Sequence, residues 1–358
     1  MKEKYLIGKK EICFLIINLI FFKSFANGPK SILRECGSSA FLSGAAAALI
    51  CLAVAAVLGA LYEKTDCRNI FELSKKYISP LFSSALQIII ILYLALSLSI
   101  ALKETVNFAS LAAFEIAPFA FIALFFAAAA FFSVKRGMEA IVRAIEIIMP
   151  FSLAVTLIML FSTAKEWDAS NLFPLFGYGF GKTAVSAIKS TPYYLDFILI
   201  FLINPFFETR ENLKKTVFSA ALFGTAINLL TLLAVNLILP YQTMPDIDFP
   251  VYQIMKTVYF GRFMQRIDAF YLLAFSLSAM SYISFGVFLM NYLLKGALGL
   301  SKNRPSSASF ALIILFGAML AEKGILNISD TALFIFELLV FIIIFLMPLL
   351  PEKMKKEA

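Results

Sequence analysis

The chain has 358 residues, of which 61% are hydrophobic and only 15% are charged, and its formal net charge is +8. A soluble globular domain is typically nearer half apolar and a quarter charged, so this composition excludes an ordinary soluble enzyme. Most of the chain divides into apolar runs of about 20 residues, the length that a helix needs to cross a bilayer. The sequence therefore predicts an all-α integral membrane protein that crosses the lipid bilayer many times.

Apolar windows bounded by charged or turn residues predict ten transmembrane helices. The expected spans are 11–34, 39–61, 80–103, 110–134, 141–163, 184–205, 214–239, 265–296, 306–322 and 330–350. Most Lys and Arg residues fall in the segments on the same side as the N-terminus, which predicts that both termini are cytoplasmic. Short amphipathic helices are expected at the membrane interface over 69–77 and 250–260. We expect a single polytopic membrane domain over residues 1–358.

The ten expected spans form two runs of five, about 11–163 and 184–350. Because five is odd, the second run enters the membrane from the opposite face, as an inverted-topology repeat requires. The first helix of each repeat in such folds is interrupted near the midplane. Helix breakers occur at both of these places, in Lys23-Ser24-Phe25-Ala26-Asn27-Gly28-Pro29 and in Ser190-Thr191-Pro192. Helices one and six are therefore expected to be discontinuous.

Several kinds of chemistry are disfavoured by the sequence. It has no His, and its four Cys residues show no metal-binding spacing, so we expect no metal and no cofactor. The basic residues are scattered through short loops, which fits membrane topology and not a nucleic-acid partner. No paired nucleophile and base and no phosphate-binding glycine loop is present. An enzyme is not expected.

Lys23 is the most informative single residue. An ammonium group at the bilayer centre costs about 2.5 to 3.5 kcal/mol on insertion scales, so it normally faces a cavity or a partner. One interpretation is a cation that replaces a bound ion or pairs with a ligand carboxylate. The alternative is a structural ion pair with Asp196, expected at a similar depth, or a lysine whose side chain extends to the interface.

The other candidate ligand-binding residues flank the two breaks. At the first, Ser24, Phe25, Ala26, Asn27 and Gly28 would present backbone N–H groups suited to a carboxylate, although a plain Gly-Pro kink is the alternative. At the second, Tyr193, Tyr194 and Asp196 follow Pro192 and are candidates for a pocket wall, although a kinked packing helix is the alternative. The acids in other spans, Glu115, Glu146 and Glu337, are interpreted as structural.

Four short motifs resemble those of the spore germination permease family. This family comprises the B subunits of nutrient germinant receptors and is a branch of the amino acid/polyamine/organocation permease superfamily. The motifs are Asn171-Leu172-Phe173-Pro174, Gly137-Met138-Glu139, Phe249-Pro250-Val251-Tyr252, and the segment 261–268 with Arg266 and Asp268. Their order and spacing carry the resemblance, which runs from about residue 10 to 300.

The resemblance implies a sensor of small nutrients, often amino acids, in the inner membrane of the dormant spore. It also implies two partners, a larger membrane-anchored A subunit and a lipoprotein C subunit. The chain departs from the family pattern at Lys23 and Ser24, where small residues are usual, and at Phe275, where Trp is common. Asp196 alone represents the acidic positions of helix six. Two alternatives stay open: a transporter of amino acids or amines with the same pocket, and a structural subunit with a degenerate pocket.

Overall fold

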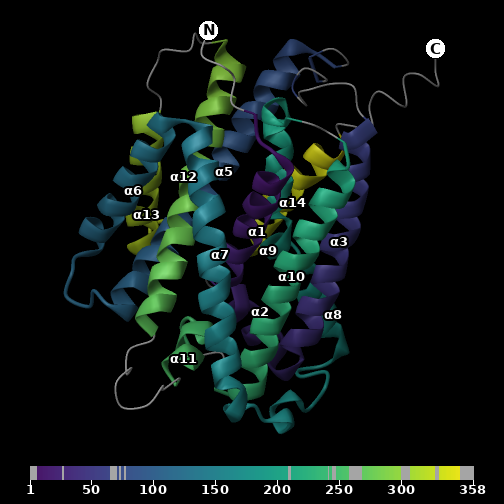
Figure 1. Cartoon of the computed structure of the whole chain (residues 1–358), viewed down its shortest axis with the longest axis vertical. Helices are drawn as coiled ribbons and strands as arrows, with labels where there is room; N and C mark the ends of the chain where they lie inside the picture. Colours follow the sequence, from purple (N-terminus) through teal and green to yellow (C-terminus); the bar gives the residue numbers. More distant parts are fainter. Residues whose placement is uncertain are drawn as a thin grey trace.

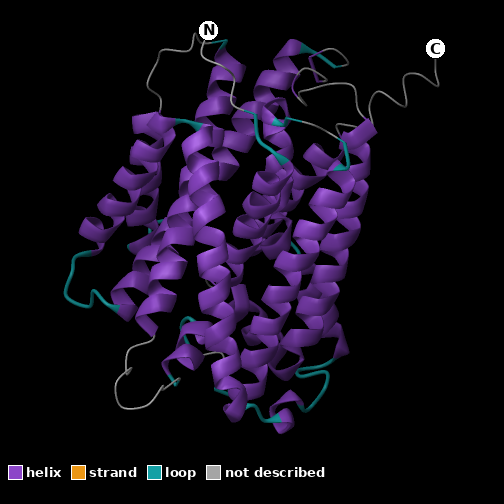
Figure 2. Cartoon of the chain, viewed as in Figure 1, coloured by secondary structure: helices purple, strands orange, loops and turns teal. Residues whose placement is uncertain are grey.

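The structure is a computed structural model of the whole chain. It describes residues 6–25, 28–64, 71, 74–75, 78–208, 211–240, 242–243, 247–257, 268–299, 307–326 and 330–346. All regular elements within these ranges are helices, and the long ones run roughly along one common axis, with α2, α8 and α11 in the lower half of the bundle (Figure 1). The connections between them lie mostly at the two ends of the bundle (Figure 2). The expected all-α fold is confirmed.

The sixth expected helix is interrupted, as predicted, whereas the first is described in two parts, and residues 26–27 at its expected break lie outside the described residues. The first consists of α1 (Lys9–Phe25) and α2 (Gly28–Cys36), and the sixth consists of α8 (Phe180–Ser190), α9 (Pro192–Leu195) and the 3₁₀ helix η4 (Asp196–Phe206). The continuous long helices are α3 (Ala40–Lys64), α5 (Pro80–Ala112), α6 (Phe119–Arg136), α7 (Met138–Ser162), α10 (Leu213–Ile238), α12 (Asp268–Leu298), α13 (Ser307–Glu322) and α14 (Asp330–Leu346). Short elements are η1 (Gly37–Ser39), η2 (Thr163–Glu166), η3 (Ala169–Leu172) and α11 (Pro250–Lys256).

Seven helices among the described residues are long and apolar enough to cross a membrane. Ser307–Glu322 and Phe334–Leu346 are shorter apolar helices, so the number of ten spans stays a prediction. Large apolar side chains cover the outside of these helices, which suits lipid and not water. Among the most exposed are Leu81, Phe121, Ile147 and Phe316.

The boundary between the third and fourth expected spans is wrong. Helix α5 continues through Lys103 and Glu104 to Ala112, and α6 begins only at Phe119. The charged pair was interpreted as the end of a span, but the helix goes on because Val106 and Phe108 are fully buried in the bundle. Glu115, placed within a span by the sequence, lies in the turn between the two helices.

The helices pack in a reciprocal pattern that relates the first five to the last five. Helix α3 packs along α10, and α5 packs along α12. The crosswise contacts are exchanged as well, because α5 contacts α13 while α12 contacts α6, and α1 contacts α10 while α8 contacts α3. A two-fold relation between two similar units produces such exchanged contacts. This packing agrees with the expected five-plus-five inverted repeat.

The interruption of helix six follows from Pro192. Proline has no N–H to donate and clashes with the carbonyl one turn earlier, so a regular helix ends before it. The carbonyl of Ile188, which Pro192 leaves without its helical donor, accepts instead from the backbone N–H of Thr191 at 3.1 Å. The chain then tightens into the 3₁₀ helix η4, in which Ile203 departs from helical geometry.

One end of the bundle is closed by backbone pairing between the start of the chain and the end of helix six. The N–H of Ile7 donates to the carbonyl of Phe206 at 2.7 Å, and the N–H of Glu208 donates to the carbonyl of Ile7 at 3.0 Å. An ion pair between Lys10 and Glu146, 2.7 Å long, joins α1 to α7 nearby. These contacts hold the ends of α1, η4 and α7 together.

At the other end, the segment between α7 and α8 is fastened to α10. The carbonyl of Leu237 accepts from the backbone N–H of Asp168 at 3.0 Å and from the side-chain amide of Asn171 at 2.9 Å. Trp167, the single tryptophan of the chain, donates its indole N–H to Thr163 at 3.2 Å. The Asn171 motif therefore acts as a tie between two helix ends.

The next part of this connection packs against the end of α2. Gly177 adopts a positive φ of 49°, and a Cβ at this position would lie 1.9 Å from the carbonyl oxygen of Cys36, so only glycine fits. The carbonyl of Pro174 accepts from the hydroxyl of Ser38 at 2.6 Å. The loop after α7 is thus held against α2 and η1.

The helix expected over 250–260 is present as α11. Its residues Val251, Tyr252, Ile254 and Met255 are almost completely buried, in contact with α10, α12 and α2, so it packs onto the bundle instead of resting free at an interface. Most of the other expected interfacial helix, 69–77, lies outside the described residues, as do residues 258–267 with Arg266 of the fourth motif.

Candidate ligand-binding site

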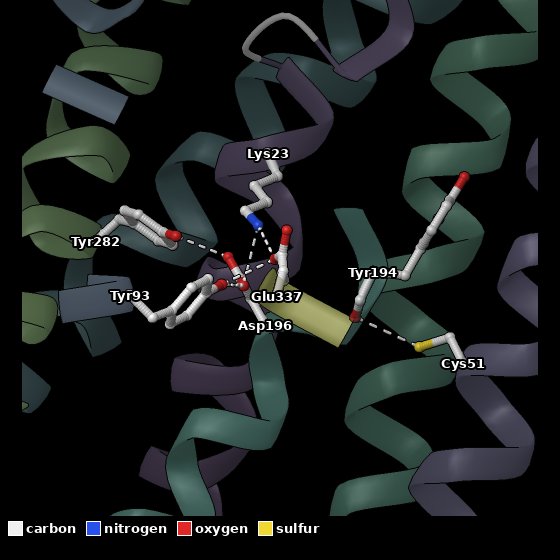
Figure 3. Close-up of polar contacts among 7 residues, drawn as sticks. All are labelled: Lys23, Cys51, Tyr93, Tyr194, Asp196, Tyr282 and Glu337. Carbon is white, nitrogen blue, oxygen red and sulfur yellow. Dashed lines mark hydrogen bonds and ion pairs between the residues drawn. The ribbon is translucent and has the colours of Figure 1, made fainter. Parts of the chain in front are cut away.

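Three charged side chains from three different elements meet inside the bundle. Lys23 lies near the end of α1, Asp196 is the first residue of η4, and Glu337 lies in α14. The Nζ atom of Lys23 is 3.1 Å from Oδ1 of Asp196 and 2.5 Å from Oε1 of Glu337 (Figure 3). We call these residues the charge cluster. It joins both interrupted helices to the last helix.

Two tyrosine hydroxyls complete the hydrogen bonding of the two acids. Tyr282, on α12, donates to Oδ2 of Asp196 at 2.7 Å. Tyr93, on α5, lies 2.9 Å from Oε1 of Glu337 and 3.4 Å from Oδ1 of Asp196. Asp196 has no exposed surface, so it needs these donors, because a buried carboxylate without hydrogen bonds is strongly destabilising.

A cavity of about 380 Å³ adjoins the cluster. Both parts of the interrupted helices contribute to it, together with α5, α12 and α14. It extends towards α2 and α8, where Lys189 and Glu35 form an ion pair 2.9 Å long and Lys30 pairs with Asp248. The lining residues are Phe22, Lys23, Lys30, Ser31, Ile32, Arg34, Glu35, Tyr93, Ser97, Ile100, Ala101, Glu104, Lys189, Ser190, Pro192, Tyr193, Tyr282, Phe334 and Glu337.

Aromatic rings hold the walls of this cavity in place. Phe22 stacks on Tyr282 with ring centroids 4.4 Å apart, and on Phe275 at 5.8 Å. Tyr193 shares a hydrogen bond with Ser31, at 2.7 Å between the two oxygens, which links α9 to α2 across the breaks. The cavity thus has a charged base, aromatic walls and further ion pairs towards α2 and α8.

The candidates at the second break separate into three environments. Tyr193 lines the cavity, and Asp196 is buried behind Lys23. Tyr194 is fully buried and points away from the cluster, towards α3 (Figure 3). Its backbone carbonyl accepts from the thiol of Cys51 at 3.5 Å. Tyr194 therefore belongs to the packing between α9 and α3.

The candidates at the first break are only partly within the described residues. Lys23 lines the cavity. Ser24 and Phe25 are the last residues of α1, and Gly28 is the first residue of α2. Ala26 and Asn27 lie outside the described residues. The proposed carboxylate-binding role of this backbone stays a prediction.

Sequence reasoning missed three members of the site. Glu337 was interpreted as structural, and Tyr93 and Tyr282 were not considered. Helices α5 and α12 are apolar around much of their circumference, so no periodic pattern indicates which side chains face a cavity. A lone acid in an otherwise apolar last helix was the available signal for Glu337. Among the described residues, no group of three or more His, Cys, Asp or Glu side chains is placed to hold a metal ion.

Comparison with known families identifies the chain. Residues 6–324 match the model of a family described as spore germination protein. The chain belongs to the spore germination protein family. It is 26% identical over 148 residues to spore germination protein KB of Bacillus subtilis (strain 168), a match that covers 40% of this chain and 39% of that protein. Glu337 lies outside the residues of the chain that match the family model.

Solved structures of transporters share the fold. The MhsT complex with L-phenylalanine has a TM-score of 0.75 at 14% identity and covers 97% of this chain and 90% of MhsT. The nucleobase-cation-symport-1 family transporter MHP1, in a closed conformation with bromovinylhydantoin bound, has a TM-score of 0.60 at 11% identity and coverage of 95% and 78%. A Na⁺-coupled sialic acid symporter has a TM-score of 0.58 at 13% identity and coverage of 95% and 84%. The chain is thus a multi-pass membrane protein with a transporter fold.

Proposed function

We propose that this protein is the nutrient-sensing B subunit of a spore germinant receptor. It lies in the spore inner membrane with both termini in the cytoplasm and works with A and C subunits. The observation that carries the proposal is the cavity of about 380 Å³ at the two helix breaks, in a member of the spore germination protein family. The ligand is an amino acid or a similar small solute, and it binds against the charge cluster.

The position of the cavity supports a signalling role. A solute in it contacts the segments on both sides of each break, as well as α5, α12 and α14. A solute that binds one arrangement of these segments more tightly than another shifts the equilibrium towards that arrangement. The A and C subunits respond to this shift, so that binding in the cavity is coupled to germination.

A transporter is the second candidate, and the fold favours it specifically. The chain aligns over 97% of its length with MhsT, whose structure contains L-phenylalanine. A carrier of amino acids or amines would use the same cavity. The two candidates differ in one respect: a carrier accumulates solute on its own, whereas a B subunit depends on its partners.

The first test is direct binding. The purified protein in detergent is heated with each of the twenty amino acids, common sugars and nucleosides, and its unfolding temperature is followed. We expect one class of solute to stabilise the protein. The Lys23→Met variant is expected to lose this stabilisation, because Lys23 holds Asp196 and Glu337 in position at the base of the cavity. Lys10→Met is the matched control, because Lys10 lies at the other end of α1, does not line the cavity and has a side chain that is 73% exposed.

A germination assay and an uptake assay then separate the candidates. In spores, Lys23→Met abolishes the nutrient response and Lys10→Met preserves it. The two variants are compared at equal amounts of protein in the membrane, because Lys23→Met is also expected to be less stable. An unchanged dose-response curve for Lys23→Met contradicts the proposal. Accumulation of labelled solute in liposomes that contain only this protein favours the carrier. If no solute stabilises the protein, even with A and C subunits present, the structural subunit with a degenerate pocket is favoured.

A further inference from the structure

The charge cluster holds more negative than positive charge. Lys23 contacts two carboxylates, so one positive and two negative groups meet at the base of the cavity, with a formal sum of −1 when all are ionised. A net charge away from water is unfavourable unless another charge compensates it. A cation from a solute would bring the sum to zero, whereas a carboxylate would bring it to −2. The base of the cavity therefore favours a cationic group.

Glu337 is the acid that is placed to receive this cation. Its Oε1 atom accepts from Lys23 at 2.5 Å and from Tyr93 at 2.9 Å. Its Oε2 atom has no hydrogen bond to any residue that the structure describes, and Figure 3 shows this oxygen without a dashed line. The side chain lines the cavity and is 12% exposed.

Asp196 is not available in the same way. Both of its oxygens are engaged, Oδ1 by Lys23 and Oδ2 by Tyr282, and its side chain has no exposed surface. Its charge is committed to holding Lys23 in place. The two acids of the cluster thus differ in role: Asp196 is internal, and Glu337 faces the solute.

We propose that the cavity binds a primary amine in its cationic form, and that its ammonium group donates a charge-assisted hydrogen bond to Oε2 of Glu337. This inference rests on the proposed function and names the class of its ligand. The aromatic walls around Phe22 and Tyr193 contact the apolar part of the molecule. Lys23 is a poor partner for a ligand carboxylate, because two carboxylates of the protein already compensate its positive charge.

The charged acceptor comes from a part of the chain that the family model does not cover. The matched residues end at 324, and α14 begins at Asp330. The match to the family model by itself therefore does not predict a preference for a cation. Other members that lack an acid in the last helix are expected not to share it.

The test compares sets of solutes that share an apolar part and differ in which charged groups they carry. Alanine, leucine and phenylalanine each form a set with the amine that lacks the carboxylate and the acid that lacks the amine. These are ethylamine and propionate, isopentylamine and 4-methylpentanoate, and phenethylamine and 3-phenylpropionate. Binding to the full chain in nanodiscs is measured by calorimetry. In the best-fitting set we expect the amine to bind more tightly than the amino acid, and at least about tenfold more tightly than the acid.

Variants of Glu337 locate the contact. Glu337→Gln keeps the size of the side chain but removes its charge, and we expect it to weaken amine binding at least about tenfold. Glu337→Asp keeps the charge and is expected to retain part of the affinity, which separates lost binding from lost folding. Glu146→Gln is the matched control, because this acid lies outside the cavity and pairs with Lys10, and amine affinity stays within about twofold of wild type.

The outcomes distinguish this inference from the proposed function. If an acid binds as tightly as its amine, and Lys23→Met abolishes its binding, the cation preference is overturned while the ligand pocket stands. An amine affinity that Glu337→Gln leaves unchanged also overturns the inference. If no member of the three sets and none of the wider nutrient panel binds, with or without A and C subunits, both proposals fall together.

Discussion

Replacing Lys23 with Met is expected to destabilise the protein strongly, and a second substitution is expected to reverse part of the loss. Lys23→Met keeps the length of the apolar side chain but leaves Asp196 and Glu337 without their shared cation. The two carboxylates then face each other inside the bundle. Replacing Asp196 with Asn in the same chain removes one of them, so the double variant Lys23→Met/Asp196→Asn is expected to be more stable than Lys23→Met alone.

The distances set the size of the effect. At an effective dielectric constant of about 20, unit charges 3.1 Å apart attract each other by about 5 kcal/mol, and charges 2.5 Å apart by about 7 kcal/mol. Desolvation of the ions offsets much of this attraction, and removing one partner from a buried ion pair typically costs about 3–5 kcal/mol. We expect a loss in this range for Lys23→Met and a coupling of at least about 1.5 kcal/mol in the double variant.

A double-mutant cycle tests this reasoning. The free energy of unfolding is measured by denaturant titration in detergent micelles for wild type, both single variants and the double variant. Two results would refute the argument. The first is a loss of unfolding free energy below about 1 kcal/mol for Lys23→Met, as for an exposed ion pair. The second is a loss in the double variant that equals the sum of the losses in the two single variants. Either result means that the cluster does not act as a coupled ionic unit.

Two further predictions concern contacts that support the cavity and the bundle. Tyr282→Phe removes the hydroxyl that donates to Asp196 at 2.7 Å. It is expected to lower the free energy of unfolding by about 1.5–3 kcal/mol in the same titration. A change below about 0.5 kcal/mol would mean that this hydrogen bond contributes little. Gly59→Ala is expected to lower stability by about 1–3 kcal/mol, because its Cβ would lie 2.8 Å from the backbone Cα of Lys214 and force α3 away from α10. Gly181→Ala is the control, since a Cβ there meets nothing within 4 Å, and it should be neutral or stabilising by up to about 1 kcal/mol; equal losses in both glycine variants would contradict the close approach.

The sequence predicts the path of the chain well where local chemistry is decisive. Proline has no N–H in any context, so the break at Pro192 could be placed before the structure was known. The similar depth of Lys23 and Asp196 followed from the rise of a helix, and the two side chains lie 3.1 Å apart. The predicted end of α5 was wrong. Phe108 is buried against its neighbours, and this burial, which the sequence does not show, outweighs the local polarity of Lys103 and Glu104.

The composition of the site was less accessible from the sequence. An acid in an apolar helix is paired or exposed according to the rotation of that helix, which neighbouring helices determine. Glu337 therefore has the same sequence signature as Glu115, although one lies in the charge cluster and the other in a turn. Tyr193 and Tyr194 are adjacent and chemically identical, yet only the first lines the cavity, because successive residues of a helix point in different directions.

The position of Trp167 makes the protein its own optical reporter. It is the single tryptophan, it does not line the cavity, and it precedes the tie between Asn171 and Leu237 at the end of α10. Fluorescence excited selectively in indole therefore reports on a single place, the junction between α7 and α10. A change in its emission when a solute binds reports motion that has reached this junction, and not contact with the solute itself. Such a signal follows transmission through the bundle in the unmodified chain, without an attached dye.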